Sequence, residues 1–265
     1  MTPMGGPLLG VVHLRPLPGS ARHVSMDEVL DRALADARAC AEGGLDGVIV
    51  ENFGDAPFRK GTRDDPVTPD VPAALAVVAD RIRQQFGLRV GINCLRNDGI
   101  AALGAAAVVS ASWIRVNVLT SAYVTDQGVI EGEAARLAAY RRQLRANVTV
   151  LADHLVKHAT PLAPCDVAVG AKDLAQRSGA DAMVLTGSRT GEPVDLALFD
   201  RVRAAVGSFP VWIGAGLDPD NAPELWRRCD GAIVGTWLNS GGDVAAPVEL
   251  ARVRRLRAAC PRRSG

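Results

Sequence analysis

The sequence predicts a (β/α)₈ barrel of the TIM type, formed as a single domain by residues 1–265. Three observations support this fold class. Short, nearly all-apolar runs of about 4–6 residues recur eight times along the chain, as expected of strands buried on both faces of a parallel sheet. Ala-, Leu- and Arg-rich stretches with helical spacing separate these runs, and polar residues stand at the end of one run after another.

The eight expected strands follow one another at the spacing that a strand–helix repeat requires. In order, they cover residues 8–13, 47–51, 89–93, 113–117, 148–153, 182–186, 210–214 and 232–235. Between the first two, apolar residues recur at every fourth position from Val29 to Ala41, which predicts one buried helix face. Residues 25–28 form a capping box before this helix, and the glycines at 43 and 44 end it.

A helix before the last strand is predicted from its start signal. Asp218 followed by Pro219 is typical of an N-cap with proline at the first helical position. The alternative fold is an open doubly wound sheet, which normally has a GxGxxG turn after its first strand. Residues 13–19 read HLRPLPG instead, so the barrel is favoured.

Composition excludes several classes of protein. The 30 Lys+Arg and 29 Asp+Glu give a formal net charge of +1, without the basic excess of a nucleic-acid-binding protein. The Arg-rich end has no interleaved aromatic residues, so we interpret it as a solvated helix face and a basic, frayed tail over 260–265. No apolar run reaches the 18 residues of a membrane span, and the five cysteines form no CxxC pair. We therefore expect a cytoplasmic protein that binds neither nucleic acid nor membrane.

The candidate catalytic residues follow the expected strands, where the carboxyl ends of a barrel carry its chemistry. Glu51 and Asp153 end the second and fifth strands, and two carboxylates in different environments can divide acid and base roles. Lys157 and His154 complete the catalytic set. Further polar residues at the strand ends are expected to bind substrate: His13, Asn52, Asn93, Arg96, Arg115, Asn117, Asp126 and His158.

Glycines after the last strands point to a phosphate. Small residues there allow backbone N–H groups to approach a phosphoryl group. The expected phosphate-binding residues are Thr186, Gly187, Ser188, Arg189, Gly214, Gly216, Gly235 and Thr236. The alternative is that these glycines only form tight turns.

No metal or cofactor is predicted. A hard divalent ion such as Mg²⁺ remains an alternative if Asp153, His154 and His158 lie on one helical turn, but Pro161 and Pro164 interrupt this segment. Nucleophilic catalysis is disfavoured because the chain has no GxSxG motif and Cys94 reads as a packed thiol.

The connection over residues 119–131 is long for a barrel. Long ordered connections are commonly lids or binding loops. Asp126 near its middle either reaches a ligand hydroxyl or forms a turn before Gly128, and both interpretations stay open.

Several long motifs together resemble the BtpA/SgcQ family. They are GVVHLRPLPGS at 10–20, DGVIVENFGDAPF at 46–58, GINCLRND at 91–98, WIRVNVLTSAYVTDQGVIEG at 113–132, VLADHLVKHATPL at 150–162, TGSRTGEPVDL at 186–196 and GAIVGTWL at 231–238. The resemblance implies a TIM-type barrel. The family takes its name from photosystem I biogenesis, yet its members look like enzymes of uncertain substrate. His154 and Arg189 depart from the family pattern and add titratable or positive character at the expected site.

These observations lead to two functional hypotheses. The first is a barrel enzyme that acts by acid–base chemistry on a phosphorylated sugar or nucleotide-like compound, as an isomerase, a lyase or an enzyme of glycosidic-bond cleavage or transfer. The second is a non-catalytic assembly factor on a barrel scaffold, which predicts an exposed apolar patch and no tight small-molecule site. Because barrels often pair through helical faces, a homo-oligomer is the default expectation.

Overall fold

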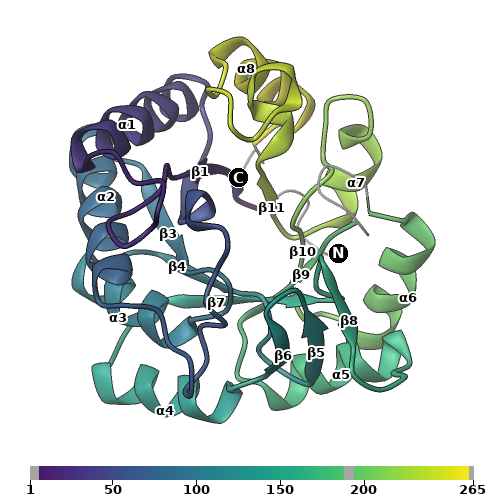
Figure 1. Cartoon of the computed structure of the whole chain (residues 1–265). Coiled ribbons are helices and arrows are strands. Elements are labelled where there is room, and N and C mark those ends of the chain that lie inside the picture. Colours follow the sequence, from purple (N-terminus) through teal and green to yellow (C-terminus); the bar gives the residue numbers. More distant parts are fainter. Residues whose placement is uncertain (1–5, 188–193, 263–265) are drawn as a thin grey trace.

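A computed structural model describes residues 6–187 and 194–262. Eight parallel strands close into a barrel in the order β1-β11-β10-β9-β7-β4-β3-β2, with the helices outside them (Figure 1). The barrel strands are β1 Leu8–His13, β2 Gly47–Glu51, β3 Arg89–Asn93, β4 Trp113–Val116, β7 Thr149–His154, β9 Ala182–Leu185, β10 Val211–Ile213 and β11 Ala232–Val234. The predicted fold class is confirmed, and the strand ends differ from the prediction by one residue at most.

One helix follows each barrel strand. The helices are α1 Met26–Glu42, α2 Asp70–Phe86, α3 Gly99–Val108, α4 Ala134–Leu144, α5 Val167–Arg177, α6 Leu196–Val206, α7 Ala222–Arg228 and α8 Leu250–Ala259. The side chain of Ser25 accepts a hydrogen bond from the backbone N–H of Glu28 at 3.1 Å, and Gly43 ends α1. The predicted first helix and its cap are therefore confirmed.

The predicted start of the helix before β11 is wrong. Helix α7 begins at Ala222, three residues beyond Pro219. Asp218 instead accepts hydrogen bonds from the backbone N–H groups of Asp220 and Asn221. This short-range bonding forms a turn that competes with the first helical turn.

Residues 119–131 form a hairpin rather than the loop expected from the sequence. Strands β5 Ala122–Thr125 and β6 Gly128–Glu131 pair antiparallel, and β8 Ala159–Pro161 pairs with β5 on the other side. Tyr123 and Ile130 pack with Val118 and Val156 on the buried face of this small sheet. The sheet thus fixes the segment after β7, which carries Lys157, over the barrel (Figure 1).

Strand register places polar residues in one layer above an apolar barrel interior. The interior is filled by Leu9, Val11, Ile49, Trp113, Leu151, Ala182, Val184, Trp212 and Ile233. His13 pairs in register with Glu51, Glu51 with Asn93, and Asn93 with Arg115. Because residues in register on neighbouring strands point to the same side, this row forms a polar layer at the carboxyl end of the barrel.

The described part of the basic tail is anchored. Cys260 is fully buried, Trp226 donates its indole N–H to the carbonyl of Pro261 at 3.1 Å, and Arg262 bonds Asp46 at 3.1 Å. Residues 260–262 of the tail that we expected to be frayed over 260–265 are therefore ordered. Residues 263–265 lie outside the described residues. Within those same limits, no helix combines the length and apolar character that crossing a membrane requires.

Candidate functional site

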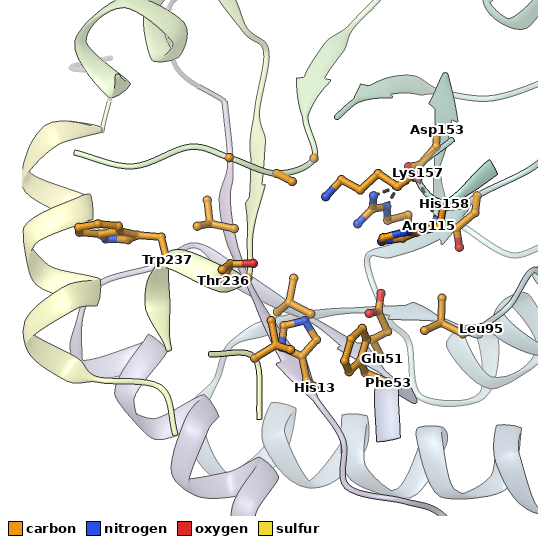
Figure 2. A pocket seen from close by; sticks show the side chains of 18 of the residues that line it. His13, Glu51, Phe53, Leu95, Arg115, Asp153, Lys157, His158, Thr236 and Trp237 are labelled. Atoms are coloured by element: carbon orange, nitrogen blue, oxygen red, sulfur yellow. Dashed lines mark hydrogen bonds and ion pairs between the residues drawn. The ribbon is translucent and has the colours of Figure 1, made fainter. Parts of the chain in front are cut away.

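A cavity of about 550 Å³ opens above the polar layer. Many of the sequence-predicted residues line it: His13, Glu51, Arg96, Arg115, Asn117, Asp126, Asp153, Lys157, His158, Gly214, Gly216, Gly235 and Thr236. Figure 2 shows Glu51 pointing into the cavity from below, with Arg115 and Lys157 above it and Thr236 on another wall. The structure thus gathers at one place residues from strands far apart in the sequence.

Arg115 and Asp153 form a buried ion pair at the centre of the site. The guanidinium Nε lies 2.8 Å from Asp153 Oδ1 and Nη2 lies 3.0 Å from Oδ2. Asn117 donates a third hydrogen bond to Oδ2 at 2.8 Å. Despite the burial of the guanidinium, the neighbouring Asp153 carboxylate raises the Arg115 pKa. Asp153 is therefore held as an acceptor of three bonds, and Arg115 is fixed as a cation facing the cavity.

Glu51 is bonded on one side only. Asn93 donates to Glu51 Oε2 at 2.6 Å, and no other hydrogen bond reaches this carboxylate within the described residues. Asn93 is buried and does not line the cavity, so its amide positions the carboxylate from behind. One oxygen of Glu51 is thus available to a ligand.

His13 presents a neutral imidazole to the cavity. Burial lowers the pKa of this ring, and the Glu51 carboxylate only partly offsets the effect. The ring meets Phe53 edge-on at 5.1 Å between centroids, and its Nδ1 is buried without a hydrogen-bond partner.

Some predicted site residues do not line the cavity. Asn52 is buried, accepts from the N–H of Leu95 at 2.7 Å and so ties β2 to the segment after β3. Thr186 and Gly187 are buried outside the cavity wall, and the Thr186 hydroxyl lies 3.5 Å from the carbonyl of Leu155. Ser188 and Arg189 lie outside the described residues.

His154 lies on the opposite face of β7 from Asp153. Its Nε2 is 3.0 Å from the carbonyl of Val167 at the start of α5, and burial lowers the pKa of the ring. The side chain lines a separate cavity of about 230 Å³ together with Tyr123 and Cys165. The structure therefore does not bring His154 into the catalytic group that the sequence predicted.

His154, which is buried, and His13, which is partly buried, predict a pH dependence of stability. The unfolded rings protonate near pH 6.5, whereas the folded rings resist protonation, so the unfolded state binds more protons below that pH. The free energy of unfolding should therefore fall as the pH drops from 7.5 to 5.5, by up to about 1.4 kcal/mol per pH unit for each ring. Urea unfolding of His13→Asn and His154→Gln should show a weaker dependence than the original chain. Identical pH dependence in all three proteins would contradict this prediction.

Backbone N–H groups without acceptors gather on the wall formed after β10 and β11. Those of Gly216, Leu217, Gly235, Thr236 and Trp237 have no hydrogen-bond acceptor in the described part of the chain, and all five residues line the cavity. Such N–H groups at a loop are suited to an anion. Gly216, Gly235 and Thr236, which the sequence predicts to bind phosphate, are among these five residues.

Gly214 has a different role on this wall. Its N–H donates to the carbonyl of Leu185 at 2.6 Å, so it is not available to a ligand. A Cβ at this position would lie 2.3 Å from Val184 Cγ1 and 2.8 Å from Thr186 Cγ2. Glycine is required here by packing.

Gly214→Ala is expected to destabilise the protein by about 1–3 kcal/mol, because the barrel wall must move to admit the methyl group. Gly104→Ala is the matched control. It lies within α3, where a Cβ would meet the Tyr140 side chain, with the hydroxyl at 3.2 Å and Cε1 at 3.9 Å, and a helical alanine gains up to about 1 kcal/mol over glycine. Thermal unfolding midpoints measure both, and equal midpoints for the two variants would contradict the prediction.

Arg252 is a cavity residue that the sequence interpretation placed on a solvated helix face. It lies on α8, lines the cavity, donates Nε to the carbonyl of Trp237 and stacks over that indole at 4.2 Å. Phe53 and Phe58, after β2, also line the cavity and were not predicted. No local pattern marks Arg252, because only the packing of α8 against residues 236–238 brings it to the site.

Among the described residues, no group of three or more His, Cys, Asp or Glu side chains is placed to hold a metal ion. His154 lies on the opposite face of β7 from Asp153, which separates the residues named for the Mg²⁺ alternative.

Comparison with known proteins identifies relatives over nearly the whole chain. A model of the BtpA family matches residues 4–261. The chain is 44% identical over 248 residues to the photosystem I biogenesis protein BtpA of Synechocystis, covering 93% of this chain and 85% of that protein. It is 46% identical over 253 residues to an uncharacterized protein of Thermococcus kodakarensis, covering 94% and 93% of the two chains.

Solved structures share the fold at low identity. Phosphoribosyl anthranilate isomerase from Thermus thermophilus aligns with a TM-score of 0.56 at 15% identity, over 96% of this chain and 97% of that one. Orotidine 5′-phosphate decarboxylase from Pyrococcus horikoshii aligns with a TM-score of 0.56 at 9% identity, over 96% and 99% of the two chains. At these identities the likeness concerns the fold alone.

Proposed function

The chain belongs to the BtpA family, and from this premise we propose that it is an enzyme that transfers a proton at a carbon atom of a small phosphorylated compound. The reaction class is isomerisation or lysis. The observation that carries the proposal is the contrast between two carboxylates in one cavity. Glu51 accepts one hydrogen bond and keeps an oxygen available, whereas Asp153 accepts three.

This contrast assigns the two carboxylates different roles. A general base needs an oxygen within reach of the substrate proton, and Glu51 has one. Asp153 is engaged by Arg115 and Asn117 and acts as a positioning residue, not in the proton-handling role expected from the sequence. Of the two strand-end carboxylates only Glu51 has an available oxygen, whereas glycosidic-bond cleavage normally uses two such groups, so isomerisation and lysis are favoured over it.

The basic side chains of the cavity would supply positive charge at the oxygen atom on which the reaction develops negative charge. When Glu51 removes a proton from the carbon beside a carbonyl, the electron pair moves to the carbonyl oxygen. Two cations offer positive charge to that oxygen. Arg115 is held in place by Asp153, and Lys157 reaches into the cavity above Arg115 (Figure 2). In an isomerase Glu51 then returns the proton to the former carbonyl carbon, while the hydroxyl proton on the first carbon moves to the former carbonyl oxygen.

The phosphoryl group would bind on the wall after β10 and β11. The five residues whose N–H groups have no acceptor within the described chain line the same cavity as Glu51, and Arg252 also lines it. Several solved barrels of similar fold are named for reactions on phosphorylated compounds. Those names guide the choice of ligands to test, and no residue role is transferred from them.

Exchange of carbon-bound hydrogen tests the proposal even while the product is unidentified. The protein is incubated in D₂O with a panel of aldose and ketose phosphates, and ¹H NMR follows the loss of each carbon-bound proton signal. We expect exchange in at least one compound, and none in its unphosphorylated counterpart at the same concentration. Binding of panel compounds without exchange or turnover of any would overturn the enzymatic proposal.

That outcome would favour the second hypothesis, a non-catalytic assembly factor. The observation that favours this hypothesis is the name of the Synechocystis relative, a photosystem I biogenesis protein. Exposed large apolar side chains in the described residues include Val24 before α1, Val108 on α3 and Val169 on α5. These three lie on different elements, whereas the exposed Val124 and Val129 pair directly across β5–β6 and form a small apolar group on that sheet.

A further inference from the structure

Two arginines differ from the other partly or fully buried arginines of the described chain. Arg32, Arg115, Arg141, Arg203 and Arg257 each have a carboxylate partner, namely Asp36, Asp153, Asp181, Asp230 and Asp46. Arg96 and Arg252 are also partly buried, yet neither has a carboxylate within 4.0 Å among the described residues. Both line the large cavity.

The two arginines approach the cavity from different parts of the barrel rim. Arg96 follows β3, while Arg252 lies on α8 after β11, and β1 and β2 stand between those strands in the barrel. The proposed phosphate wall accounts for Arg252 alone. Arg96 therefore calls for a second anionic group on the same ligand.

The bonding of Arg96 leaves most of its donors available. Its Nη2 donates to the carbonyl of Lys157 at 2.7 Å, which holds the side chain in place without neutralising it. Burial lowers the Arg96 pKa even though Asp153, Asp126 and Glu51 act in the opposite direction. A partly buried guanidinium gains most from a directly bonded anion.

We propose that the substrate carries a carboxylate as well as a phosphoryl group, with the carboxylate bound by Arg96 and the phosphoryl group at the β10–β11 wall. This inference rests on the proposed function and deepens it. A carboxylate fits better than a second phosphoryl group, because Glu51, Asp126 and Asp153 would repel a dianion more strongly than a monoanion. A planar carboxylate also matches the fork of guanidinium donors.

Two small ligands isolate the contribution of the carboxylate. Glycerol 3-phosphate has a hydroxymethyl group where 3-phosphoglycerate has a carboxylate, and the two are otherwise identical. Isothermal titration measures the affinity of the protein for each. We expect 3-phosphoglycerate to bind about 10–100-fold more tightly, the effect of a charge-assisted hydrogen-bonded pair. Glycerate, which lacks the phosphoryl group, should bind more weakly than either, and 2,3-bisphosphoglycerate should not exceed 3-phosphoglycerate.

Variants assign that preference to Arg96. In Arg96→Gln the advantage of 3-phosphoglycerate should disappear, while the affinity for glycerol 3-phosphate stays within about threefold. Arg96→Lys should keep part of the advantage and serves if Arg96→Gln does not fold. Arg252→Gln should weaken both phosphates equally. Arg63→Gln removes the same charge from an exposed position outside the cavity and should change neither affinity.

The outcomes separate this inference from the proposed function. Equal affinities of the two phosphates for the original chain, or an unchanged preference in Arg96→Gln, would overturn the carboxylate subsite and leave the phosphate wall standing. Tighter binding of 2,3-bisphosphoglycerate than of 3-phosphoglycerate would overturn the preference for a single phosphoryl group beside the carboxylate. Failure of every phosphate to bind would overturn the proposed function itself.

Discussion

Replacing Glu51 with glutamine is expected to slow carbon–hydrogen exchange of the active phosphate ester by about a thousandfold, which is the contribution of a positioned general base. Glutamine keeps the size of the side chain, and its carbonyl oxygen can still accept the bond that Asn93 donates at 2.6 Å. The amide has no lone pair basic enough to remove a proton from carbon. Binding of the phosphate should therefore survive while exchange is lost, and isothermal titration beside ¹H NMR in D₂O measures the two effects.

Asp126→Asn is the matched control for Glu51→Gln. Asp126 lines the same cavity but lies at the turn of the β5–β6 hairpin, where it accepts a bond from Gln127 at 2.6 Å. The variant removes one carboxylate charge from the cavity and should keep exchange within about tenfold of the original rate. If Glu51→Gln also stayed within tenfold, Glu51 would not be the base.

Much of this site could be predicted because the carboxyl ends of all strands meet at one end of a barrel, so residues at those ends become neighbours. His13, Glu51, Asn93 and Arg115 end or nearly end their strands in the sequence, and the observed register joins them into one row. The strand–helix repeat was enough to indicate the fold class, because buried parallel strands are almost uniformly apolar. Their position at the strand ends was enough to predict that Glu51, Arg115 and Asp153 lie together, and all three line the cavity.

Whether each strand-end side chain points into the barrel or outward was harder to predict than its position in the sequence. Asp153 and His154 are adjacent polar residues at the end of an apolar strand, which has no alternating pattern to show which one points inward. Leu151, in the interior cluster, is two residues before Asp153, so a period of two would have selected Asp153 over His154. The β5–β6 hairpin also had a signal, since short β-prone runs flank the two residues before Gly128, whose φ is +96°.

The roles of the residues depended on contacts that no sequence pattern contains. Asp153 and Glu51 look equivalent as strand-end carboxylates, and only the three bonds to Asp153 separate them. Arg252 belongs by sequence to a run of exposed arginines, and tertiary packing selects it from that run. Hydrogen-bond partners set by long-range packing therefore limited the functional prediction more than the fold did.

Removing the guanidinium of Arg115 is expected to produce the largest loss of stability. Arg115→Met leaves the Asp153 carboxylate buried with Asn117 as its remaining side-chain donor among the described residues, and breaking a buried ion pair from one side costs about 3–5 kcal/mol. For a chain of this size the melting temperature should fall by about 10 °C. Arg115→Met/Asp153→Asn carries neither charge and should recover about 1–3 kcal/mol of the loss. A single variant within about 1 kcal/mol of the original chain would contradict the buried pair.

The same variants decide between positioning and proton transfer for Asp153. If Asp153 acts only by holding Arg115, then Asp153→Asn and Arg115→Met disturb one unit, and their effects on the exchange rate should not add in the double variant. If Asp153 itself carried a proton, its loss would multiply the loss from Arg115→Met. Because Asp153 accepts bonds from Nε and Nη2 of Arg115 and from Asn117, a proton on this carboxyl would remove the negative charge that holds Arg115. We therefore expect non-additive rates, with Glu51 left as the carboxylate that exchanges protons with the substrate.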